Sequence, residues 1–116
     1  QRQMCIETGI VNTEGWQIRK EIADLISTEP IIKETFGSSR LPERIRTLSD
    51  QEAIESITLV GLCTDICVIS NAMVLKAFFP ELPIHVDASC CAGVTRESHL
   101  QALEAMKVCQ MIVENE

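Results

Sequence analysis

The segment that most constrains the fold is an apolar run that leads directly into a long apolar helix. Ile57-Thr-Leu-Val-Gly-Leu62 is apolar at nearly every position, as in strands that are buried on both faces of a parallel sheet. Residues 65–79 are then apolar nearly all round, which predicts a buried helix, and Pro80 stops it. A strand followed at once by such a helix is typical of a βα unit.

The remainder of the chain alternates in the same way. Further strands are predicted at residues 31–33, 82–87 and 108–113, and further helices at residues 13–26, 41–48 and 95–106. Alternating strands and helices predict an α/β fold, a three-layer sandwich with a mostly parallel sheet and helices on both faces, as in Rossmann-like proteins. At 116 residues we expect one domain, 1–116.

Composition disfavours several classes of partner. The formal net charge is −7 and there is no basic cluster, so no nucleic-acid partner is predicted. No apolar stretch reaches the roughly 18 residues that a membrane span requires, so no membrane partner is predicted. Six cysteines without a secretory signal indicate reduced thiols and a cytoplasmic location. Because the chain has no C-x2-C or H-x3-H pair, structural zinc is not predicted, and no cofactor is expected in this chain.

Chemically useful residues follow the predicted strands. Lys33, Cys63 and Asp87 lie at or just past strand ends, where open α/β sheets bind ligands. If Thr64 is the N-cap, Cys67 lies in the first turn of the helix, where unpaired N–H groups and the helix dipole favour a thiolate. An ammonium such as Lys33 would favour it further, and the same N–H groups could hold an oxyanion. The pattern is typical of acyl transfer through a thioester.

Less specific interpretations exist for each of these residues. Cys67 could simply be buried, and Lys33 could be a solvated charge. Cys90 and Cys91 are expected to pack as small apolar side chains, His99 to be a surface or capping residue, and His85 to face solvent. Cys63 and Cys67 could also form a thiol redox pair.

Three segments resemble one known family. GLCTDICVISNA is similar to the nucleophile motif of the isochorismatase-like cysteine hydrolases, the group that includes nicotinamidases. DASCCAGVTRESHLQALEAM resembles the segment that follows this motif in nicotinamidase-related amidases, and IIKETFGS resembles their lysine strand. The likeness extends from about Thr13 to the C-terminus.

The resemblance implies a role for three residues and a substrate class. Cys67 would be the nucleophile and Lys33 the lysine of an Asp-Lys-Cys triad. The Leu62–Cys63 peptide would be cis, and the backbone N–H groups of Cys63 and Cys67 would form the oxyanion hole. The implied activity is a cysteine hydrolase that cleaves a small, nicotinamide-like carboxamide; isochorismate-like enol ethers are an alternative substrate class. A homo-oligomer is also implied.

The family's aspartate motif, of the form D-x-Q-x-D-F, and its metal-binding Asp and His residues are not found in this sequence. We therefore expect the family's N-terminal strand and metal-site segment to be missing here, with a divalent, zinc-like metal compatible with the intact protein. The alternative is a non-catalytic fragment, or a degenerate α/β subunit of an oligomer.

Overall fold

The computed structural model of the chain describes residues 17–26 and 28–116. It contains two compact units, residues 1–30 and residues 31–116. In the first unit the described residues form one short helix, α2 (Lys20–Ala23), in which Lys20 pairs with Asp24 at 2.9 Å. The predicted helix over 13–26 is thus too long at its C-terminal end, and residues 13–16 lie outside the described residues.

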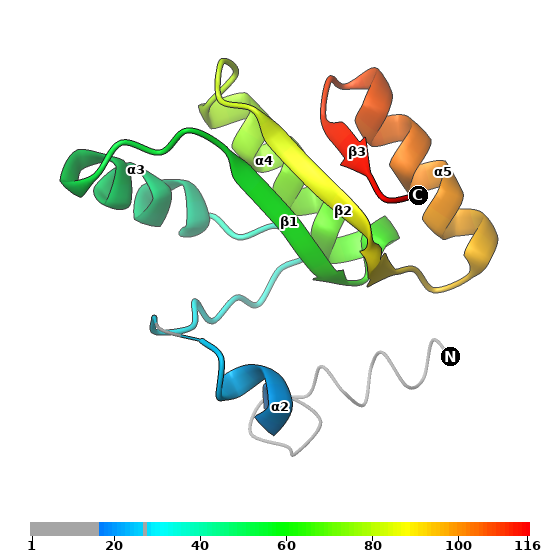
Figure 1. Cartoon of the computed structure of the whole chain (residues 1–116), viewed down its shortest axis with the longest axis horizontal. Helices are drawn as coiled ribbons and strands as arrows, with labels where there is room; N and C mark the ends of the chain where they lie inside the picture. The colour runs from blue at the N-terminus through cyan, green and yellow to red at the C-terminus, as the bar shows by residue number, and fades with distance from the viewer. Residues whose placement is uncertain (1–16, 27) are drawn as a thin grey trace. The chain divides into compact units, whose positions relative to one another are not determined.

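The second unit is built on a parallel sheet of β1 (Ile57–Leu62), β2 (Ile84–Ala92) and β3 (Ile112–Glu114), in that order (Figure 1). The helices are α3 (Leu41–Gln51), the π-helical turn η2 (Thr64–Val68), α4 (Ile69–Phe78) and α5 (Arg96–Val108). Each strand follows a helix or leads into one, so the α/β fold class is confirmed.

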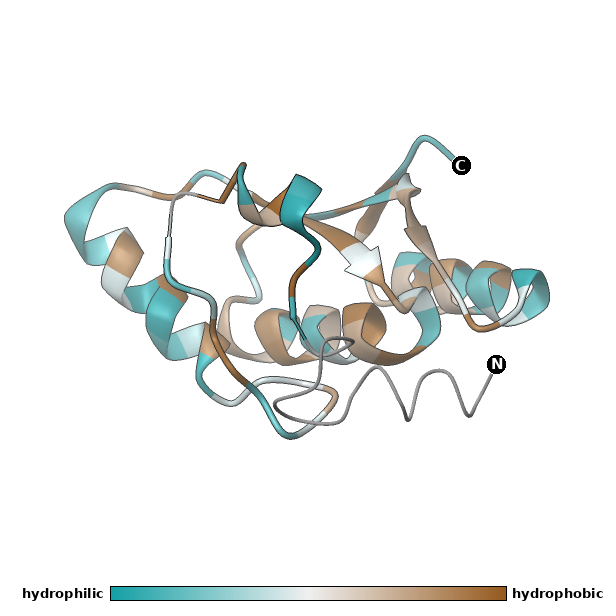
Figure 2. Cartoon of the chain, turned by 90° about the horizontal axis from the view of Figure 1, so that it is seen from below, coloured by the Kyte–Doolittle hydropathy of each residue, from teal (hydrophilic) through white to brown (hydrophobic). Residues whose placement is uncertain are grey.

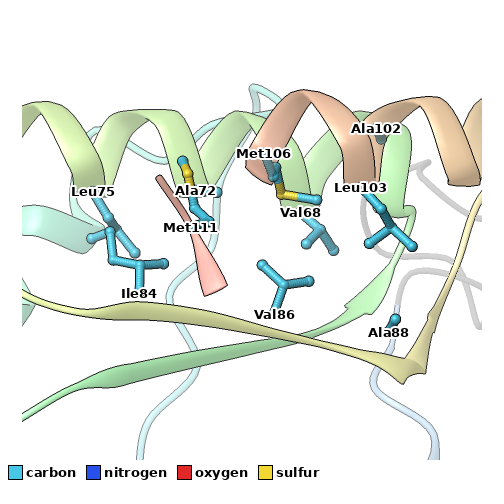
Figure 3. Close-up of a cluster of buried hydrophobic side chains, with 10 residues drawn as sticks. All are labelled: Val68, Ala72, Leu75, Ile84, Val86, Ala88, Ala102, Leu103, Met106 and Met111. Carbon is cyan, nitrogen blue, oxygen red and sulfur yellow. The ribbon is translucent and has the colours of Figure 1, made fainter. Parts of the chain in front are cut away.

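The core lies between the sheet and the helices α4 and α5, which cover the same face of it (Figure 3). Side chains of β2 alternate between this core and the opposite face, as the pleat requires. Figure 2 shows teal and brown alternating along α5, as expected for an amphipathic helix with one face on a sheet. The buried residues of the core are Val68, Ala72, Leu75, Ile84, Val86, Ala88, Ala102, Leu103, Met106 and Met111.

The opposite face of β1 carries exposed apolar side chains. Val60 is 57% exposed and Leu62 is 70% exposed, because the strand alternates between half-buried and exposed positions. Within the described residues β1 pairs only with β2, so its other edge bears no strand. The predicted burial of this strand on both faces therefore differs from what the described part of the chain shows.

One predicted strand is wrong. Residues 31–33 form no strand, and Ile32 is 57% exposed. Two adjacent isoleucines favour extended backbone, but a strand is stabilised only when a neighbouring strand pairs with it. Elsewhere the boundaries move: α5 runs to Val108, the chain turns at Gln110 with φ of 72°, and β3 starts only at Ile112.

Candidate active site

The candidate site is the turn that joins β1 to η2. The Leu62–Cys63 peptide is cis, in agreement with the bond that the resemblance implied. The Cys63 carbonyl accepts hydrogen bonds from the N–H groups of Ile66 (3.1 Å) and Val68 (3.0 Å). Two N–H groups of the turn therefore donate to one carbonyl oxygen, and Cys67 lies between these two donor residues in the sequence.

The helix begins one residue earlier than predicted. Cys63, with extended backbone, is the N-cap, and Thr64 is already the first helical residue. Thr64 makes no side-chain cap; its side chain is fully buried, and its hydroxyl lies 2.7 Å from Nδ1 of His99. His99 is half-buried rather than a surface or capping residue, so that prediction is wrong.

A second contact also ties this turn to the start of α5. The Asp65 carboxylate accepts the Val94 N–H at 3.2 and 3.3 Å from its two oxygens. Thr95 then caps α5 through a reciprocal pair of hydrogen bonds with Ser98. The turn at residues 63–68 is thus held between the end of β1 and the beginning of α5.

Cys67 and Lys33 lie in direct contact although 34 positions separate them. The Lys33 amine donates to the Cys67 sulfur at 3.3 Å and to the Thr35 carbonyl at 3.0 Å. Cys67 is half-buried and Lys33 is exposed, on a loop rather than at a strand end. The contact places a hydrogen-bond donor directly beside the sulfur.

Asp87 was predicted at a strand end but lies inside β2, which continues to Ala92, and Asp87 and His85 have partners other than Lys33 and Cys67. Asp87 accepts hydrogen bonds from the N–H and hydroxyl of Ser89 and from the Asn115 amide. His85 is half-buried and pairs with Glu114 at 2.5 Å, which corrects the prediction that it faces solvent. These contacts join β2 to β3 and do not include Lys33 or Cys67.

No carboxylate in the described part of the chain forms an ion pair with Lys33. Nor do residues 17–26 and 28–116 bring together three or more His, Cys, Asp or Glu side chains that could hold a metal ion. These residues do not fit a metal site, so no step below is routed through a metal.

The remaining cysteines differ in environment. Cys90 and Cys109 are exposed thiols, whereas burial raises the pKa of the half-buried Cys91 above its ordinary value of 9.0. Exposure of Cys90 shows that it does not pack as a small apolar side chain. Cys67, by contrast, contacts the amine of Lys33.

Sequence reasoning missed Asn71, whose amide contacts both the Cys67 backbone and the backbone of residues 36–38. The available signal was its spacing: a residue four positions after Cys67 lies on the same helical face one turn on. Its partners in the loop could not be read from spacing.

A groove of about 330 Å³ lies elsewhere, at the far end of α4. The helix is ten residues long, so the groove is about 15 Å from the Cys67 end. It holds none of the predicted site residues and is lined by Ile45, Ser49, Ile54, Phe79, Pro80, Glu81 and Leu82.

Fold and site together define an α/β protein with a cysteine nucleophile candidate at a strand-to-helix turn. The sequence model of the Isochorismatase domain family matches residues 3–115. The chain therefore belongs to the isochorismatase family of hydrolases. A comparison with curated proteins finds no match.

Solved structures give the same fold. The chain is 26% identical to the nicotinamidase of Staphylococcus aureus, with a TM-score of 0.73 over 93% of this chain and 70% of that one. For the nicotinamidase of Bacillus subtilis the values are 24% identity and a TM-score of 0.74, covering 92% of this chain and 62% of that one. A pyrazinamidase of Pyrococcus horikoshii, solved in complex with zinc, is 21% identical with a TM-score of 0.60, over 77% of this chain and 48% of that one. The last two likenesses concern the fold alone.

No helix in the described residues is long and apolar enough to cross a membrane.

Proposed function

We propose that this chain carries the nucleophile of an amidase that cleaves a small, nicotinamide-like carboxamide through a thioester. The observation that supports this most is the 3.3 Å contact between the Lys33 amine and the Cys67 sulfur, at the turn whose sequence resembles the family's nucleophile motif. The 26% identity to a nicotinamidase supports the choice of an amide substrate.

In the proposed first step the Cys67 thiolate attacks the amide carbonyl carbon, and the carbonyl electrons move to oxygen. The backbone N–H groups of Cys63 and Cys67 bind the resulting oxyanion. When the tetrahedral intermediate collapses, the carbon–nitrogen bond breaks and the leaving nitrogen takes a proton from the Lys33 ammonium. Ammonia and a Cys67 thioester are formed.

In the second step water attacks the thioester carbonyl and releases the carboxylic acid. The Cys67 sulfur leaves as a thiolate, and the water proton returns to the neutral Lys33 amine. The site is thereby restored to its ammonium–thiolate form. Cys63 contributes only backbone, whereas Cys67 and Lys33 contribute side chains.

The proposal extends to the setting of the intact protein. It would act in the cytoplasm as a homo-oligomer on a small-molecule substrate, and a divalent, zinc-like metal is compatible with the intact protein. The location follows from the cysteines without a secretory signal, and the other features follow from the family resemblance.

The test is ammonia release from nicotinamide and other small carboxamides, with wild-type protein and two variants. Cys67→Ala should lower turnover by about 10³-fold or more, because the covalent step is lost. The matched control is Cys109→Ala, which removes an exposed thiol at the end of α5 and should leave turnover unchanged.

Turnover that survives Cys67→Ala would rule out the proposed nucleophile. If a folded wild-type protein releases no ammonia from any carboxamide, the alternatives are an enol-ether hydrolase or a non-catalytic subunit. Release of an enol-ether cleavage product would then decide between these two.

A further inference from the structure

The loop that carries Lys33 has little packing of its own. Residues 32–36 are all exposed, and none of them belongs to a helix or strand. An exposed loop of this kind is expected to sample many conformations. The position of the Lys33 amine beside the sulfur therefore requires something that holds the loop.

Asn71, on α4, makes contacts of the required kind. Its side-chain oxygen accepts the Ser38 N–H at 2.7 Å, and its side-chain nitrogen donates to the Phe36 carbonyl at 3.4 Å. One amide group thus binds the loop backbone on both sides of Gly37. Gly37 itself lies close to α4, since a Cβ atom there would be 3.2 Å from the Val74 side chain.

The same amide also binds the nucleophile residue. The Asn71 nitrogen donates to the Cys67 carbonyl at 3.1 Å, one helical turn earlier. The backbone of Cys67 and the backbone of the lysine loop are therefore joined through a single side chain. Within the loop, the Lys33 amine bonds the Thr35 carbonyl, so a shift of the loop would carry the amine with it.

We infer that Asn71 is a positioning residue that keeps the Lys33 amine on the Cys67 sulfur by fastening the 33–38 loop to the nucleophile helix. An asparagine suits this task because its amide both accepts and donates at this length. An aspartate could still accept the Ser38 N–H, but its other oxygen would face the carbonyls of Phe36 and Cys67. This inference rests on the proposed role of the Lys33–Cys67 pair.

The experiment measures the rate at which iodoacetamide alkylates Cys67, followed peptide by peptide with mass spectrometry. The exposed Cys109 is the reference thiol in the same molecule, so the Cys67/Cys109 rate ratio corrects for probe concentration. We expect Lys33→Met to lower this ratio about fivefold, as for the loss of a partly exposed charge contact. Asn71→Ala should lower it by a similar factor.

The double variant K33M/N71A is the decisive arm. If Asn71 acts through Lys33, the double variant should have the same ratio as Lys33→Met alone, because the two effects are then not additive. The thiolate of Cys67 is reported by the part of the absorbance near 240 nm that disappears in Cys67→Ser. This absorbance should fall in the same variants in which the alkylation ratio falls. The matched control is Thr47→Val: the Thr47 hydroxyl also donates to the carbonyl four residues earlier on its helix, 3.1 Å away, but on α3.

Two results would overturn the inference. One is a higher Cys67/Cys109 ratio in Asn71→Ala, which would mean that the loop merely covers the sulfur. The other is a double variant whose Cys67/Cys109 ratio falls by the product of the two single fold-decreases, which would mean that Asn71 and Lys33 act independently. If circular dichroism shows that Asn71→Ala is unfolded, Asn71→Asp, nearly identical in shape, replaces it in the same comparison.

Because alkylation requires no substrate, its outcome is separate from that of the proposed function. If no ammonia is released but the double variant has the same Cys67/Cys109 ratio as Lys33→Met, the amidase proposal is wrong and the role of Asn71 remains. Ammonia release with independent single effects would do the reverse.

Discussion

At the scale of single residues, Thr64 connects the turn at residues 63–68 to α5. It is fully buried, and its hydroxyl lies 2.7 Å from Nδ1 of the half-buried His99. Thr64→Val keeps the shape of the side chain but leaves the ring nitrogen without this partner. We expect a loss of about 1–3 kcal/mol in the free energy of unfolding, measured by urea titration.

Thr47→Val is the control for this prediction too, because its hydroxyl is exposed and its loss should cost within about 0.5 kcal/mol. Equal losses of unfolding free energy in the two variants would show that the Thr64–His99 contact contributes no more to stability than an exposed hydroxyl does.

The residue scale also shows what a sequence can predict about a site. Cys67 and Lys33 were identified because each lies next to an element boundary or motif that the sequence displays. The pairing of Thr64 with His99 and of Asn71 with the loop joins residues about 35 positions apart. Such pairings depend on how the βα unit packs against its neighbours, and spacing within one element does not contain that information.

At the scale of elements, Asp87, inside β2, joins this strand to the end of β3 through Asn115. Hydrogen bonds from the Ser89 hydroxyl and the Asn115 amide hold the pKa of Asp87 below its ordinary value of 3.8. A carboxyl group whose pKa is lower in the folded state than in the unfolded state stabilises the fold at pH values above its unfolded-state pKa. That contribution is lost as the pH falls through the folded-state pKa.

Removing one donor should therefore raise the pKa of Asp87 toward 3.8. Asn115→Gly is the suitable change, because Asn115 has φ of 57° and glycine adopts this conformation without strain. Ser89→Ala should raise the pKa further, since the Ser89 hydroxyl has the largest effect. Titration of the Asp87 carboxyl carbon by NMR measures both, and an unchanged pKa in both variants would contradict the assignment.

The elements predicted best are those whose burial dominates their sequence. The bounds of the strand 57–62 agree with β1, and the apolar segment 65–79 agrees with η2 and α4 to within a residue. The failure at residues 31–33 has the opposite cause. Isoleucines alone indicate a preference for extended backbone, whereas strand formation depends on a neighbour that lies elsewhere in the sequence.

At the scale of the whole molecule, the chain spans 70% of the Staphylococcus aureus enzyme and 48% of the Pyrococcus horikoshii enzyme. Within the described residues, β1 lies at one edge of the sheet. Edge strands pair readily with other strands. We therefore expect copies of the chain to associate through β1, as an extension of the proposed homo-oligomer.

Association through β1 can be tested by placing a charge on this strand. Val60 is 57% exposed and lies in the middle of β1, so Val60→Lys should suppress edge pairing and lower the sedimentation coefficient toward that of a monomer. The matched control is Val108→Lys, which adds the same charge at an 83% exposed valine at the end of α5 and should leave association unchanged. Sedimentation velocity over a range of concentrations measures both. A wild-type protein that remains monomeric throughout, or two variants that dissociate equally, would show that the edge of β1 does not form the contact.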